Sequence, residues 1–133
     1  MRLILADTGV MSRYLTNVEK FEKAIDETIS FQRIAVSTTT QMELLHWING
    51  YKSLLNEKDY RSILFKINNL KVLQIDRKIA SLAIELSKRY MFGVPDLLTA
   101  ATAICYELEI FTINTKHFKD IKGLNLYIPA NFE

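Results

Sequence analysis

Three acidic side chains stand at positions of the sequence from which they could bind a metal ion together. Asp7 directly follows an apolar run, Glu43 lies early in a predicted helix, and Asp96 opens an apolar helix of small residues. Converging carboxylates repel one another, and burial raises the cost of keeping them charged, so a divalent cation would resolve the conflict. Ligands that are all oxygen atoms favour Mg²⁺ or Mn²⁺ over zinc. The chemistry expected of such a centre is metal-assisted phosphodiester hydrolysis, in which the ion activates water and stabilises the departing oxygen.

Each of these acids also has a purely structural explanation. Asp7 could cap a helix that follows it, and Asp96 would suit the positive end of a helix dipole. Glu43 fits an S/T-x-x-E capping box with Thr40, although Thr38 begins an equivalent pattern. If Thr38 is the cap, Glu43 lies past the first turn and has no capping role. Three caps have no reason to converge, whereas the ligands of one metal ion must.

The elements that must position these acids alternate between strands and helices along the chain. Short apolar runs that end abruptly in polar residues are typical of strands buried on both faces. The predicted strands are Leu3–Ala6, Arg33–Val36, Lys71–Ile75 and Ile110–Ile113, with Leu124–Ile128 as a candidate edge strand. The predicted helices span Val18–Ser30, Gln41–Gly50, Tyr60–Ile67, Asp76–Leu86 and Pro95–Glu107, followed by a helical turn at Thr115–Asp120. Asp76 is the candidate N-cap of the fourth of these helices. This alternation predicts a three-layer α/β/α domain with a mainly parallel central sheet.

The carboxyl ends of the predicted strands are where functional groups should gather, because open parallel sheets bind ligands there. Asp7, Glu43 and Asp96 all fall at that level of the fold. Thr112 and Asn114, at the end of the last apolar strand, could join them with further oxygen ligands.

Composition and length predict a single globular domain over residues 1–133, since 49% of the residues are hydrophobic and 24% are charged. The net charge of +2 is too small to indicate nucleic-acid binding, although a local patch could still support it. Cys105 is the only cysteine, which suits a reducing compartment, and its apolar neighbours favour a packing role. The apolar run before Asp7 is too short for a signal peptide, and no segment approaches membrane-spanning length. We therefore expect a cytoplasmic protein with no membrane partner.

Three other classes of protein are excluded by the periodicity of the chain and by motifs that it lacks. Asp7-Thr8-Gly9 matches the active-site triplet of aspartic proteases, but long segments of 3.6-residue period and few hairpin signals argue against that all-β fold. A dehalogenase-like hydrolase would carry a second acid where Gly9 stands. No glycine-rich phosphate loop supports a nucleotide-binding interpretation.

Four motifs in order along the chain resemble those of PIN-domain ribonucleases, and most closely the VapC-type toxins of prokaryotic toxin–antitoxin pairs. The motifs are Asp7-Thr8, Glu43 in a Ser/Thr-led helix, Asp96–Ala103 and Thr112–Phe118. No single motif is specific, but the ordered set covers nearly the whole chain.

The resemblance implies a PIN-like α/β/α fold and an Mg²⁺- or Mn²⁺-dependent endoribonuclease. It implies metal-binding and catalytic roles for Asp7, Glu43 and Asp96, and supporting roles for Thr8, Thr112 and Asn114. The partners implied are an RNA substrate, a cognate antitoxin held by helices of the first half of the chain, and a second copy in a homodimer.

His117 departs from the family pattern, because Asn114-Thr115-Lys116-His117-Phe118 has histidine where an aspartate is usual. Neutral imidazole is a poorer ligand for magnesium, which puts a second metal position in doubt. His117 could instead be a catalytic proton donor or a phosphate contact, or an ordinary surface histidine. Asp120 could replace the missing acid, and Gly9 departs from the usual Asn or Ser. A second function therefore stays open, namely a catalytically weak PIN domain that binds RNA or a protein partner.

Basic and aromatic side chains near these motifs are candidates for RNA contacts. Cations could bind phosphates without regard to sequence, and the candidates are Arg13, Lys116, Lys119 and Lys122. Trp47 and Tyr51, four residues apart on one helix, could stack on a base, although packing is the expected role.

Overall fold

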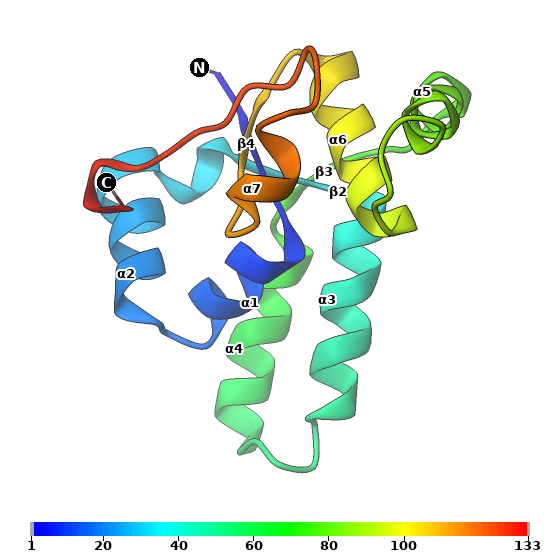
Figure 1. Cartoon of the computed structure of the whole chain (residues 1–133). Coiled ribbons are helices and arrows are strands. Elements are labelled where there is room, and N and C mark those ends of the chain that lie inside the picture. The colour runs from blue at the N-terminus through cyan, green and yellow to red at the C-terminus, as the bar shows by residue number, and fades with distance from the viewer. Residues whose placement is uncertain (1, 133) are drawn as a thin grey trace.

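The computed structural model describes residues 2–132, and its centre is a small sheet of four strands (Figure 1). The strands lie in the order β3-β2-β1-β4, and every neighbouring pair is parallel. Their bounds are β1 (Ile4–Ala6), β2 (Ile34–Ser37), β3 (Lys71–Leu73) and β4 (Glu109–Phe111). All residues of β1 and β2 are buried, which explains why these segments read as continuous apolar runs.

Helices cover both faces of this sheet and create two hydrophobic cores. The helices are α1 (Thr8–Leu15), α2 (Glu19–Glu22), α3 (Thr38–Gly50), α4 (Glu57–Asn68), α5 (Arg77–Ser87), α6 (Val94–Tyr106) and α7 (Thr115–Phe118). Along β1, Ile4 and Ala6 pack with α1 and α3, whereas Leu5 packs with α5 and α6. This period-two alternation places the sheet between two helical layers. The predicted α/β/α fold with a parallel sheet is therefore confirmed.

Several helix boundaries follow local signals in the sequence. Asp76 caps α5 by accepting a hydrogen bond from the Ile79 amide at 2.9 Å, as the sequence predicts. Gly93 is the residue before α6, so Pro95 is the second helical residue rather than the first. The same helix ends at Glu107, which adopts the left-handed conformation at φ 55°.

Two segments differ from the elements expected for them. Only Asp7 separates β1 from helix α1, which the sequence pattern marked only as a helix that Asp7 could cap. Leu124–Ile128 does not form a strand: the chain makes a single parallel bridge between Ile110 and Leu126. A turn at Gly123 (φ 88°) before the segment and Pro129 after it limit the extended stretch.

The predicted helix Val18–Ser30 is present in two parts. It begins as α2, continues as the π-helical segment Lys23–Ile29, and stops at Ser30, whose φ of 87° cannot continue a right-handed helix. Figure 1 shows α3 and α4 side by side as an antiparallel pair that extends away from the sheet. Among the described residues, no helix combines the length and apolar character that crossing a membrane requires.

Candidate active site

Asp7 lies at the carboxyl end of β1, one of the two inner strands of the sheet, and its side chain is only 7% exposed. One carboxylate oxygen accepts a hydrogen bond from the Val10 amide at 3.0 Å, so Asp7 does cap α1. The other oxygen accepts a hydrogen bond from the Thr112 hydroxyl, which is also buried. Because each carboxylate oxygen has a second lone pair, capping leaves both oxygens able to accept a further ligand.

The charge of Asp7 is disfavoured by its surroundings. Burial raises the pKa of the Asp7 carboxyl above its ordinary value of 3.8, and the negative charge of Asp96 raises it further. The hydrogen bonds from Thr112 and Val10, together with the positive charge of Arg13, act in the opposite direction. Burial is the largest cause of this rise, and the repulsion from Asp96 is a smaller one.

Glu43 reaches this site through a hydroxyl of α1. Ser37 is the cap of α3, since its side chain accepts from the Thr40 amide at 3.2 Å. Glu43 therefore lies beyond the first turn and has no capping role. Its Oε1 instead accepts a hydrogen bond from the Thr8 hydroxyl at 2.6 Å, across 35 residues of sequence.

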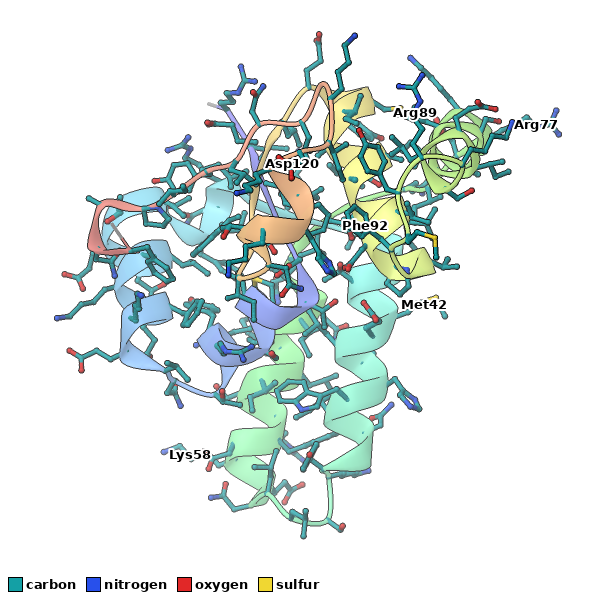
Figure 2. The ribbon with its side chains drawn as sticks, in the orientation of Figure 1. Met42, Lys58, Arg77, Arg89, Phe92 and Asp120 are labelled. Atoms are coloured by element: carbon teal, nitrogen blue, oxygen red, sulfur yellow. The ribbon has the colours of Figure 1, made fainter. Side chains whose placement is uncertain are left out.

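Asp96 is in the first turn of α6, where its side chain is 30% exposed. Its Oδ2 lies 3.5 Å from Nδ1 of His117, longer than an ordinary hydrogen bond. One face of the His117 ring stacks on Phe92, with the ring centroids 4.7 Å apart. Figure 2 shows Phe92 between α7 and the start of α6, the two elements that carry His117 and Asp96.

Asn114 contributes to the site through its backbone rather than its side chain. Its amide donates to the Thr112 hydroxyl at 3.0 Å, which holds that hydroxyl in place for donation to Asp7. The Asn114 side chain is exposed. Thr112 thus connects the loop after β4 to the carboxylate after β1.

The acidic side chains suit a hard divalent cation, although they do not form a ready-made ligand cluster. Within residues 2–132, no group of three or more His, Cys, Asp and Glu side chains is close enough to hold a metal ion. Magnesium requires only one or two carboxylates when phosphate oxygens and water complete its shell. Asp7 and Asp96 could provide these two carboxylates, and Glu43 accepts a hydrogen bond from Thr8, the residue after Asp7. The donors are all oxygen, which fits Mg²⁺ or Mn²⁺.

The remaining candidate residues take varied positions. Arg13 is exposed and donates from Nη1 to the Gly9 carbonyl at 2.9 Å, beside Asp7. Asp120 lies past the end of α7, on the side of that helix away from α1 in Figure 2.

Trp47 is partly buried against the core of the first half, with its ring centroid 6.2 Å from that of Tyr51. The position of Trp47 supports the packing role expected for it, whereas Tyr51 is 48% exposed. The three lysines Lys116, Lys119 and Lys122 are exposed.

Phe92 and Ser37 are the site residues that the sequence reasoning missed. Ser37 precedes a run of three threonines, so the pattern alone offered several equivalent caps. The aromatic side chains Tyr90 and Phe92 alternate just before α6, which signals a shared face, but nothing local indicates that they meet His117.

Comparison with known proteins gives the same fold. A family model described as "PIN domain" matches residues 4–124. The chain is 54% identical over 39 residues to "Ribonuclease VapC" of Rickettsia bellii (strain RML369-C), a match that spans 29% of each protein.

Two solved structures are similar over nearly the full length of the chain. "Toxin-antitoxin complex from Klebsiella pneumoniae" contains a chain that is 26% identical, with a TM-score of 0.73 over 91% of this chain and 94% of that one. "Crystal structure of DNA bound VapBC from Salmonella typhimurium" contains one that is 23% identical, with a TM-score of 0.78 over 96% of this chain and 98% of that one.

Proposed function

Because the chain belongs to the PIN domain family, we propose that it is a metal-dependent endoribonuclease. The observation that carries the proposal is the state of Asp7. This carboxylate is buried beside a second acid, and burial together with the charge of Asp96 raises its pKa. A perturbed acid of this kind, held in place by two hydrogen bonds at the carboxyl end of a central strand, is typical of catalytic sites.

The described residues support distinct roles around the metal. Asp7 and Asp96 would hold Mg²⁺ or Mn²⁺, and Glu43 would complete the acidic set. A bound divalent ion supplies a water nucleophile at neutral pH and stabilises charge on the departing oxygen of a phosphodiester. Thr112 and Thr8 orient the Asp7 and Glu43 carboxylates by donating hydrogen bonds to them.

The biological role that we propose is that of a toxin restrained by an antitoxin. The support is the ribonuclease VapC match over 39 residues and the toxin–antitoxin complex that contains a chain of the same fold. We place its action in the cytoplasm, and the homodimer expected from the resemblance stays a prediction. Expression of the chain alone should arrest growth, and Asp7→Asn or Asp96→Asn should relieve the arrest.

Incubation of the purified protein with mixed single-stranded RNA tests the activity directly. We expect cleavage with Mg²⁺ or Mn²⁺, none with a chelator, and a loss of about 100-fold or more in Asp7→Asn and Asp96→Asn. Asp76→Asn is the matched control, because Asp76 also caps a helix by accepting from the third residue along, at 2.9 Å against 3.0 Å for Asp7. Asparagine caps as well as aspartate, so both variants should remain folded.

The second candidate function is a PIN domain that binds RNA without cutting it. The observation that favours it is His117 in place of a further acid, together with the absence of a three-acid cluster among residues 2–132. RNA binding with no cleavage under any divalent ion, and no effect of Asp7→Asn, would establish this alternative and refute the nuclease.

A further inference from the structure

An aromatic stack ends at the candidate active site. The rings of Tyr90 and Phe92 are 5.7 Å apart with an angle of 10° between their planes. The rings of Phe92 and His117 are 4.7 Å apart with an angle of 22°. The three rings therefore form a nearly parallel column whose last member, His117, lies beside Asp96.

This column is held rigidly at its inner end. The Tyr90 hydroxyl donates to the Asp120 carbonyl and accepts from the Lys122 amide, each at 3.3 Å. Phe92 also packs against Phe118, a fully buried residue of α7, with ring centroids 6.4 Å apart. Because its supports are in place before any ligand binds, the outer ring loses little freedom on stacking.

The outer ring remains accessible. Phe92 covers one face of the His117 imidazole, yet 52% of the His117 side chain is exposed to solvent. The opposite face of the imidazole is thus available to a planar group. Nucleobases of single-stranded RNA are planar groups that proteins bind by stacking on aromatic and histidine rings.

We propose that His117 is a stacking platform for one nucleobase of single-stranded RNA, next to the phosphate that a metal ion held by Asp7 and Asp96 would bind. This inference rests on the proposed function, since it assigns part of the substrate to a named surface. Stacking uses the exposed face of the ring and not its nitrogen atoms. The exposed Lys116 and Lys119 lie on or next to the same short helix and supply positive charge for the flanking phosphates.

Three substitutions of His117 separate stacking from the other roles of a histidine. His117→Phe keeps a ring but has no nitrogen facing Asp96. His117→Asn keeps a polar donor near that carboxylate but has no ring. His117→Ala has neither, and His46→Ala is the control because His46 is the other histidine of the chain and is exposed on α3.

The first measurement is the binding of a fluorescein-labelled single-stranded RNA decamer of mixed sequence, by anisotropy, in an Asp7→Asn background without divalent ions. We expect His117→Ala and His117→Asn to raise Kd about tenfold relative to the Asp7→Asn protein that keeps His117. The Kd of His117→Phe should stay within about threefold of that reference. In the cleavage assay, the same substitutions should raise KM for His117→Ala and His117→Asn while kcat stays unchanged.

Two results would overturn the platform. One is a His117→Phe protein as impaired as His117→Ala, and the other is a loss of kcat at unchanged KM, which indicates proton donation instead. An unchanged Kd in His117→Ala, in a protein that cleaves RNA through Asp7, refutes the platform and leaves the nuclease standing. A protein that cleaves no RNA but binds the decamer through the ring at position 117 refutes the nuclease and supports the platform.

Discussion

The hydrogen bond from Thr112 to Asp7 should make stability depend on pH in a measurable way. Thr112→Val removes the hydroxyl and keeps the shape of a side chain that is only 5% exposed. The hydroxyl donates to a buried carboxylate, and this contact lowers the pKa of Asp7 against the larger effect of burial, which raises it. The substitution should therefore raise that pKa further and make the ionised carboxylate costlier in the folded protein.

The expected magnitude follows from the charge on the acceptor. A hydrogen bond to a charged group contributes about 2 kcal/mol, whereas one between neutral groups contributes about 1 kcal/mol. The folded pKa of Asp7 lies above its ordinary value of 3.8, so the stability linked to its protonated form is complete below that value. This contribution to the free energy of unfolding is lost as the pH rises through the pKa of Asp7 in the folded protein. Thr112→Val loses more of it, because its Asp7 has the higher pKa. Thr112→Val should thus cost about 2 kcal/mol at pH 7 and about 1 kcal/mol at pH 3.5.

Thermal unfolding followed by circular dichroism at the two pH values measures this difference. At about 3 °C per kcal/mol for a domain of this size, the unfolding temperature should fall by roughly 6 °C at pH 7 and roughly 3 °C at pH 3.5. Thr102→Val is the matched control, because the buried Thr102 hydroxyl donates to a neutral acceptor, the Leu98 carbonyl, at 2.7 Å.

Two results would refute this reasoning. Equal losses at both pH values would show that Asp7 is not ionised against the Thr112 hydroxyl in the folded protein. A pH dependence of the same size in Thr102→Val would show that the effect belongs to global acid unfolding and not to the Asp7 site.

Three further predictions concern the metal, the contact between Thr8 and Glu43, and the Tyr14 hydroxyl. Mn²⁺ at about 100 times its Kd should stabilise the protein by about 2.7 kcal/mol, which corresponds to a rise of roughly 8 °C in unfolding temperature. Asp96→Asn should abolish this rise, and a rise that persists in the variant would contradict the assignment of Asp96 as a metal ligand. Thr8→Val should weaken Mn²⁺ binding by about tenfold in calorimetry, because the Glu43 carboxylate loses the hydroxyl bound at 2.6 Å, and unchanged affinity would remove Glu43 from the site. Tyr14→Phe should lower the unfolding temperature by about 3 °C with cleavage unaffected. The Tyr14 hydroxyl donates to Asp26 at 2.7 Å, and because Asp26 is exposed we expect this bond to contribute about 1 kcal/mol. Burial and Asp26 raise the pKa of Tyr14 in the folded protein above its ordinary value of 10.0. Above pH 10 the Tyr14 hydroxyl therefore ionises in the unfolded chain first, which destabilises the unsubstituted protein, so the difference in unfolding temperature between it and Tyr14→Phe should narrow.

Some features of the site are local and were predictable from neighbouring residues. The apolar run before Asp7 and the proline before Asp96 place both acids at element boundaries, where the structure has them. The capping role of Asp76 was likewise predicted correctly. By contrast, helix α1 was indicated only through its cap, because its polar first turn, with Gly9, weakens the helical pattern.

Other features depend on residues that are distant in sequence. The pattern could not decide which hydroxyl near Glu43 caps α3, and the structure assigns that role to Ser37, so that Glu43 is free to bind Thr8. Leu124–Ile128 has the composition of a strand, yet it pairs at one position because the turns around it leave no room for more.

The sequence by itself determined the alternation of strands and helices, because apolar period and capping residues act over a few positions. Only the tertiary structure decided which distant residues contact these acids. The strand order places β1 beside β4, which brings Asp7 to Thr112 across 105 residues of sequence. The packing of α7 against the segment before α6 places His117 on Phe92 and beside Asp96. Such contacts depend on which elements become neighbours. Hydrophobic burial across the sheet determines those neighbours, and it involves residues distant in sequence, so no local pattern predicts it.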